Sequence, residues 1–167
     1  MNYHEIKAIA DRIVAELNPC CDRCCIAGSI RRKKVECKDI EIVIIPKSSE
    51  LIKLVAIVDK WQKVKGEATG KYTQRILPEG IKLDLFIANN DNWGLIFAIR
   101  TGSADFSHKV LACGWKKKGY TSVNGILYKT INPCESDLDL SNPIFVREEK
   151  DLFDLIEVEY IEPEQRI

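Results

Sequence analysis

The sequence predicts an α+β protein, because helical and strand-like patterns both occur in it and are unevenly distributed. One amphipathic stretch opens the chain, and short alternating runs between turn residues fill the rest of the first half. The second half has longer stretches with helical periodicity. At 167 residues, the chain suits one domain or two small lobes that share a core.

Local signals justify each element in turn. Asn2 is suited to cap the first helix, and Pro46 ends the second strand. Ser48-Ser49-Glu50 is expected to cap the next helix, and Pro78-Glu79-Gly80 is expected to form a turn between strands. The expected helices are residues 3–17, 49–61, 92–100, 103–118 and 148–156, and the expected strands are residues 23–27, 39–45, 62–67, 71–77, 81–88, 120–123, 126–130 and 143–147.

The composition is that of a soluble intracellular protein. Hydrophobic residues make up 46% of the chain and charged residues 30%, and no apolar run approaches the roughly 20 residues of a membrane span. The N-terminus lacks the apolar core of a signal peptide. Seven cysteines, an odd number, suit a reducing compartment better than a disulfide framework. We therefore expect a cytoplasmic location.

The net charge of zero conceals a strong asymmetry. Residues 1–134 carry 22 Lys and Arg against 14 Asp and Glu, a net charge of +8, whereas residues 135–167 carry 3 against 11, a net charge of −8. A basic body can attract a polyanion, although ordinary surface variation could produce the same numbers.

The stretch from Ile26 to Ile45 has the parts that phosphoryl transfer requires. Gly28-Ser29 forms a turn suited to a phosphate, and a basic run follows it. Asp39 and Glu41 lie two residues apart on a predicted strand, so their side chains share a face. Repulsion between two neighbouring carboxylates raises the pKa of each, unless a cation lies between them.

These motifs resemble, in order, those of the nucleotidyltransferases related to DNA polymerase beta, and among them the family X DNA polymerases. GSIRRKKVECKDIEI resembles the metal-binding segment of that family, KLDLFIA its strand with a third carboxylate, and IRTGSADFSHKVL its TGS turn and following helix. The tail IEVEYIEPEQR resembles the family's closing Y-x-x-P-x-x-R. A chain this short resembles the compact viral or phage members.

The resemblance implies a fold and a set of metal ligands. Residues 1–88 would form the catalytic nucleotidyltransferase palm, a mixed sheet flanked by helices, and residues 89–167 a small nucleotide-covering α+β subdomain. Asp39, Glu41 and Asp84 would be the catalytic residues and would hold two Mg²⁺ ions, for which Mn²⁺ can substitute.

The resemblance also implies contacts to the substrates. The expected nucleotide-binding residues are Gly28, Ser29, Arg32, Thr101, Gly102, Ser103, Asp105 and Ser107. The expected nucleic-acid contacts are Lys33, Lys34, Lys71, Arg75, His108 and Lys109.

The expected activity is template-directed, gap-filling DNA synthesis of the repair type. Its partners would be a nucleoside triphosphate and gapped or short duplex DNA, with no membrane, and the protein would act as a monomer. Two alternatives stay open: a template-independent nucleotidyltransferase that acts on a nucleic-acid end, a protein or a small molecule, and a non-catalytic DNA-end-binding module or toxin–antitoxin partner. The Cys20–Cys25 cluster contains one CxxC, which is too few ligands for a closed zinc site.

Overall fold

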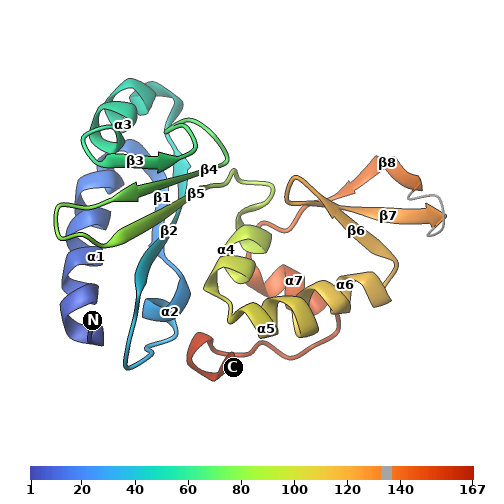
Figure 1. Ribbon diagram of the computed structural model, residues 1–167. Helices are drawn as coiled ribbons and strands as arrows, with labels where there is room; N and C mark the ends of the chain where they lie inside the picture. The colour runs from blue at the N-terminus through green and yellow to red at the C-terminus, as the bar shows by residue number, and fades with distance from the viewer. Residues whose placement is uncertain (133–136) are drawn as a thin grey trace. The chain divides into compact units, whose positions relative to one another are not determined.

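A computed structural model describes residues 1–132 and 137–167 (Figure 1). Helices and strands are mixed and the strands form two separate sheets, so the predicted α+β class is confirmed. The chain divides into two compact units, Met1–Asn89 and Asn90–Ile167. Among the described residues, every helix is too short or too polar to cross a bilayer.

The first unit contains a mixed sheet of five strands in the order β1-β2-β5-β4-β3. β2 and β5 are parallel, and the other neighbouring pairs are antiparallel. The connection from β2 to β5 runs through a helix and two strands, which is long enough to bring two parallel strands together. The strands are β1 (Cys21–Ile26), β2 (Asp39–Pro46), β3 (Gln62–Lys65), β4 (Tyr72–Ile76) and β5 (Lys82–Ile87).

Helices α1 (Tyr3–Leu17) and α3 (Leu51–Val58) pack with this sheet around one apolar core (Figure 1). Helix α1 has the predicted bounds, and the Asn2 side chain accepts a hydrogen bond from the Glu5 N–H at 3.0 Å, which confirms the predicted cap. Ile6, Ala10, Ile13 and Leu17 of α1 are fully buried in this core.

The alternation along β2 and β5 separates apolar from acidic side chains. Ile40, Ile42 and Leu83 belong to the core that α1 and α3 cover. Neighbouring residues of a strand point to opposite faces. Asp39, Glu41 and Asp84 therefore lie on the other face, and each is only partly buried.

The second unit combines a winding helical segment with a three-stranded antiparallel sheet. The two-residue hairpin Asn124-Gly125 joins the first two strands, and both of its residues have positive φ, as tight hairpins require. The elements are α4 (Trp93–Thr101), α5 (Ala104–Phe106), a π-helical segment (Ser107–Ala112), α6 (Cys113–Lys117), β6 (Tyr120–Val123), β7 (Ile126–Asn132), β8 (Asp137–Ile144) and α7 (Glu149–Leu155).

Three predicted elements differ from the structure. The predicted helix at 103–118 is interrupted by the π-helical segment. The predicted helix at 49–61 begins as a 3-10 turn and ends at Val58, and the predicted Ser48-Ser49-Glu50 cap is wrong because none of the described side chains caps its N-terminus. The predicted strand at 143–147 is replaced by β8, which pairs with β7 through Leu138 and Asp139. The β8 segment does alternate between Asp and Leu at residues 137–140, a strand-like pattern that the prediction missed.

The C-terminal tail is anchored by a buried arginine. Arg166 is fully buried, and its guanidinium donates to Glu149 Oε1 at 2.9 Å and to the Ile161 carbonyl at 2.9 Å. Three aromatic rings, those of Phe106, Phe153 and Tyr160, lie 5.2–5.6 Å from its charged centre. Tyr160 also donates its hydroxyl to Glu149. The Y-x-x-P-x-x-R pattern thus closes the core of the second unit.

We expect Arg166→Met to lower the free energy of unfolding by about 3–5 kcal/mol, because it leaves the Glu149 carboxylate buried without its cation. The matched control is Arg147→Met, which breaks an exposed pair with Asp91 and should cost about 1 kcal/mol or less. Urea unfolding of the full chain measures both. Equal losses in the two variants would contradict the anchoring role.

Candidate active site

The register of β2 and β5 brings the predicted carboxylates onto neighbouring strands. Glu41 pairs with Asp84, and Asp39 pairs with Lys82. Paired residues of adjacent strands point to the same face, so the three carboxylates and one lysine share a small region of the sheet. Glu41 and Asp84 are 43 positions apart in the sequence, whereas the ladder makes them direct neighbours.

Two polar side chains of β4 hold the Asp84 carboxylate. The Tyr72 hydroxyl and the Gln74 amide both donate to Asp84 Oδ1, the latter at 2.7 Å. Gln74 is the register partner of Asp84 across the antiparallel β4–β5 pair. The Tyr72 ring stacks on Phe86 with the centroids 5.0 Å apart. Neither Tyr72 nor Gln74 was predicted as a site residue.

The environment of Asp39 disfavours its charge. Burial raises the pKa of Asp39 and the charge of Asp84 raises it further, while Lys82 and Lys38 act in the opposite direction. Ionised Asp39 therefore lowers the stability of the fold. This cost is absent below the ordinary pKa of 3.8 and develops as the pH rises through the higher folded-state pKa. A cation beside these carboxylates would relieve the cost.

The Gly28-Ser29 turn lies directly against Glu41. Gly28 has a φ of +60°, and a Cβ built on it would lie 1.8 Å from Glu41 Oε2. The Ala27 N–H donates to the Glu41 carbonyl at 2.8 Å, which fastens the turn to β2. Only glycine combines this backbone conformation with this close approach. The turn continues into the short helix α2 (Gly28–Arg31).

Ser29 carries a hydroxyl with unused hydrogen-bonding capacity. Its Oγ is buried, and nothing in residues 1–132 or 137–167 hydrogen-bonds to it. Leaving such a group unsatisfied costs about 1–3 kcal/mol, so structures usually provide a partner or a ligand for it. The position beside Gly28 makes the turn suitable for an anionic group.

The three carboxylates are not preassembled as a metal cluster. Within the described parts of the chain, no three His, Cys, Asp or Glu side chains lie together closely enough to hold a metal. Two contacts explain the spacing, since Glu41 lies over Gly28 and Asp84 is held from β4 by Tyr72 and Gln74. Like charges also separate when no cation lies between them.

The basic residues of the first unit that were predicted to contact substrates differ in their exposure to solvent. Lys33 and Lys71 are exposed, and Arg32 and Lys34 are half-buried in the segment that follows the Gly-Ser turn. Arg75 differs because it is fully buried. Its guanidinium donates to the carbonyls of Val58 and Gly66 and to the Asp59 carboxylate, so in this structure Arg75 is a structural residue and not a nucleic-acid contact.

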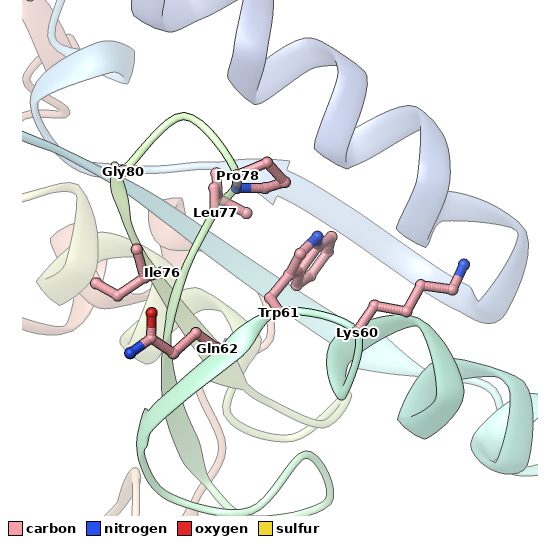
Figure 2. A pocket seen from close by; sticks show the side chains of 7 residues that line it. All are labelled: Lys60, Trp61, Gln62, Ile76, Leu77, Pro78 and Gly80. Atoms are coloured by element: carbon pink, nitrogen blue, oxygen red, sulfur yellow. The ribbon is translucent and has the colours of Figure 1, made fainter.

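A separate pocket of about 390 Å³ lies where α3 leads into β3 and β4 turns toward β5 (Figure 2). Figure 2 shows the indole of Trp61 between the Leu77-Pro78 corner and Lys60. None of the residues predicted for catalysis or binding lines it. The lining residues are Lys60, Trp61, Gln62, Ile76, Leu77, Pro78 and Gly80.

Most of the second unit is similar to a known protein domain. Residues 97–167 match the family model of the DNA polymerase beta thumb. This match covers less than half of the chain and shows a similarity to the DNA polymerase beta thumb over that part. No curated protein matches the chain. The matched thumb extends from α4 to the C-terminus and includes the Arg166 anchor and both residues of the Tyr160–Glu149 hydrogen bond.

The hydroxyls of the thumb's TGS segment make local hydrogen bonds. Thr101 donates to the Phe97 carbonyl at 2.7 Å, and Ser107 donates to the Ile99 carbonyl at 2.8 Å. Ser103 caps α5 by accepting from the Phe106 N–H at 3.2 Å. Gly102 has a φ of +68°, and its peptide bond to Ser103 is cis. These side-chain hydrogen bonds help to fix the shape of the turn.

The other predicted thumb residues lie on the surface. Asp105 and Lys109 are exposed and form an ion pair one helical turn apart, with 2.7 Å between Asp105 Oδ2 and Lys109 Nζ. The hydrogen bond from Lys109 lowers the pKa of Asp105. His108 is exposed beside them. All three side chains are therefore exposed to solvent, and the charges of Asp105 and Lys109 partly cancel.

A glycine pair tests whether the turn positions the Glu41 carboxylate. Gly28→Ala and Gly80→Ala both introduce a side chain at positive φ and should each cost about 1 kcal/mol of stability. Only the alanine at position 28 collides with Glu41, because nothing lies within 4 Å of a Cβ at position 80. We expect Mn²⁺ binding, measured by calorimetry, to weaken on the order of 10-fold in Gly28→Ala alone. Equal Mn²⁺ affinities in the two variants would show that the position of Glu41 does not affect metal binding.

Proposed function

We propose that this chain is a Mg²⁺-dependent nucleotidyltransferase that transfers a nucleotidyl group from a nucleoside triphosphate to a 3′-hydroxyl, and that it fills short gaps in DNA under the direction of a template. The proposal rests chiefly on the register of β2 and β5, which makes Glu41 and Asp84 neighbours on the face that also bears Asp39. The thumb match supports a polymerase-like protein that binds DNA.

The side chains present suit Mg²⁺, because this ion prefers carboxylate oxygens. Asp39, Glu41 and Asp84 would hold two such ions, with Mn²⁺ as a substitute. The raised pKa of Asp39 is a further sign of crowded negative charge that a cation would neutralise. When bound, the metal would offset the charge of the phosphates and lower the pKa of the attacking hydroxyl.

The chain's own groups would then act on the reacting atoms. In the transfer, the 3′-oxygen bonds to the α-phosphorus, and the bond from that phosphorus to the pyrophosphate breaks. Asp84 would also help to accept the proton of the 3′-hydroxyl, while Tyr72 and Gln74 hold its Oδ1 from β4. Ser29 Oγ and the backbone of Gly28-Ser29 would donate to the terminal phosphates, and Arg32 would add positive charge as the pyrophosphate leaves.

Basic residues would bind the nucleic acid and the thumb would help to bind the nucleotide. Lys33, Lys34 and Lys71 would contact the phosphate backbone, with an affinity that falls as salt rises. On the thumb, the Thr101–Ser103 turn would contact the nucleotide through its backbone.

A gap-filling assay tests the proposal. The full chain is incubated with Mg²⁺, one labelled dNTP at a time and duplexes that carry a one-nucleotide gap opposite each of the four bases. We expect incorporation that follows the template base. Asp84→Asn should lower the rate on the order of 1,000-fold, because it removes both a metal ligand and the proton acceptor.

Asp11→Asn is the matched control, because Asp11 is exposed on α1 and forms a surface pair with Lys7. This variant should retain the wild-type rate. Incorporation that ignores the template would instead indicate a template-independent transferase. DNA binding without any incorporation would indicate a non-catalytic module.

A further inference from the structure

The hydrogen bonds to Asp84 are unevenly divided between its two oxygens. Tyr72 and Gln74 both donate to Oδ1. In the described parts of the chain, Oδ2 accepts no hydrogen bond. A carboxylate has about four lone-pair sites, so two donors on one oxygen leave the other oxygen available for a ligand.

The two donors are themselves held firmly by the sheet. Gln74 lies directly opposite Asp84 in the β4–β5 ladder, and Tyr72 lies opposite Phe86. The rings of Tyr72 and Phe86 are nearly parallel, with 24° between their planes, and Lys65 Nζ lies 5.0 Å from the centroid of the Tyr72 ring. These contacts keep the Tyr72 ring in place with its hydroxyl beside Asp84.

This arrangement restricts how Asp84 can coordinate a cation. An unrestrained carboxylate can rotate and offer either oxygen or both. Two donors on Oδ1 resist that rotation, because turning the carboxylate would break both hydrogen bonds. Partners of this kind orient metal-binding side chains, and their loss typically weakens metal affinity by about 10–100-fold.

We propose that Tyr72 and Gln74 are positioning residues that hold Oδ1 of Asp84 and thereby reserve Oδ2 as the single oxygen that it offers to a divalent cation. The inference rests on the proposed function, because it assigns these two residues to the metal site of that reaction. It gives β4 a role in orienting a metal ligand, although the carboxylate motifs lie on β2 and β5.

The test compares two nearly isosteric variants by their affinity for Mn²⁺. Tyr72→Phe keeps the stacked ring and removes the hydroxyl, and Gln74→Met keeps the length of the side chain and removes the amide. We expect each to raise the Kd for Mn²⁺, measured by calorimetry on the full chain without nucleotide or DNA, on the order of 10-fold. In the gap-filling assay, each should need a similarly higher Mn²⁺ concentration for half-maximal rate and should reach the wild-type kcat at saturation.

The rescue by Mn²⁺ distinguishes positioning from a merely structural role, which added metal would not restore. Tyr128→Phe on β7 and Gln62→Met on the exposed strand β3 are the matched controls and should bind Mn²⁺ like the wild type. The urea midpoints of all four variants report any general loss of stability.

The outcomes separate this inference from the proposed function. If Asp84→Asn loses Mn²⁺ binding while Tyr72→Phe and Gln74→Met retain wild-type affinity, the positioning role is wrong and the metal site stands. If the wild type and Asp84→Asn bind Mn²⁺ equally, or neither binds, the metal assignment fails and both proposals fall.

Discussion

The parallel pairing of β2 with β5 is the constraint on which the rest of the first unit depends. Its register sends Ile40, Ile42 and Leu83 into the core under α1 and α3 and leaves the acidic residues on the other face. A slip by one residue would exchange the two faces, burying carboxylates and exposing isoleucines. The apolar core thus fixes the register, and the register fixes where the carboxylates lie.

Placing three carboxylates on one face of the sheet lowers the stability of the fold, and the neighbouring residues only partly offset this effect. Asp39 is raised in pKa by its burial and by Asp84, and the lysine paired with it across the ladder reduces the effect. Glu41 lies against a glycine that tolerates positive φ, and Asp84 is held by two donors from β4. Sites that must bind a cation commonly reduce stability in its absence, and the surrounding structure compensates. The cation that we propose would neutralise this crowded negative charge.

The local features of the fold were predictable from the sequence, and the non-local ones were not. Helix α1 follows from its apolar spacing and its Asn2 cap, and the β4–β5 turn follows from its proline and glycine. The sheet order depends on contacts between distant segments, which a single sequence does not reveal. Arg75 is an example. A basic residue on a strand suggests a solvent-exposed position, yet Arg75 is buried and donates to the carbonyls of Val58 and Gly66.

The candidate site was predictable to the same extent. The acidic motifs identify Asp39, Glu41 and Asp84 as candidates, whereas the roles of Tyr72 and Gln74 emerge only from the β4–β5 register. The alternation in β4 together with the short turn that follows could have indicated that Gln74 faces Asp84. The tail motif was recognised from its letters, but its cause, a cation enclosed by three rings and a carboxylate, required the structure.

The most direct test of the central claim is the anomalous scattering of Mn²⁺ in a crystal of the full chain grown with a non-hydrolysable deoxynucleoside triphosphate. The account predicts Mn²⁺ peaks within direct coordination distance of carboxylate oxygens of Asp39, Glu41 and Asp84, with Asp84 contributing through Oδ2. Mn²⁺ bound to other residues, with none in contact with these three carboxylates, would contradict it.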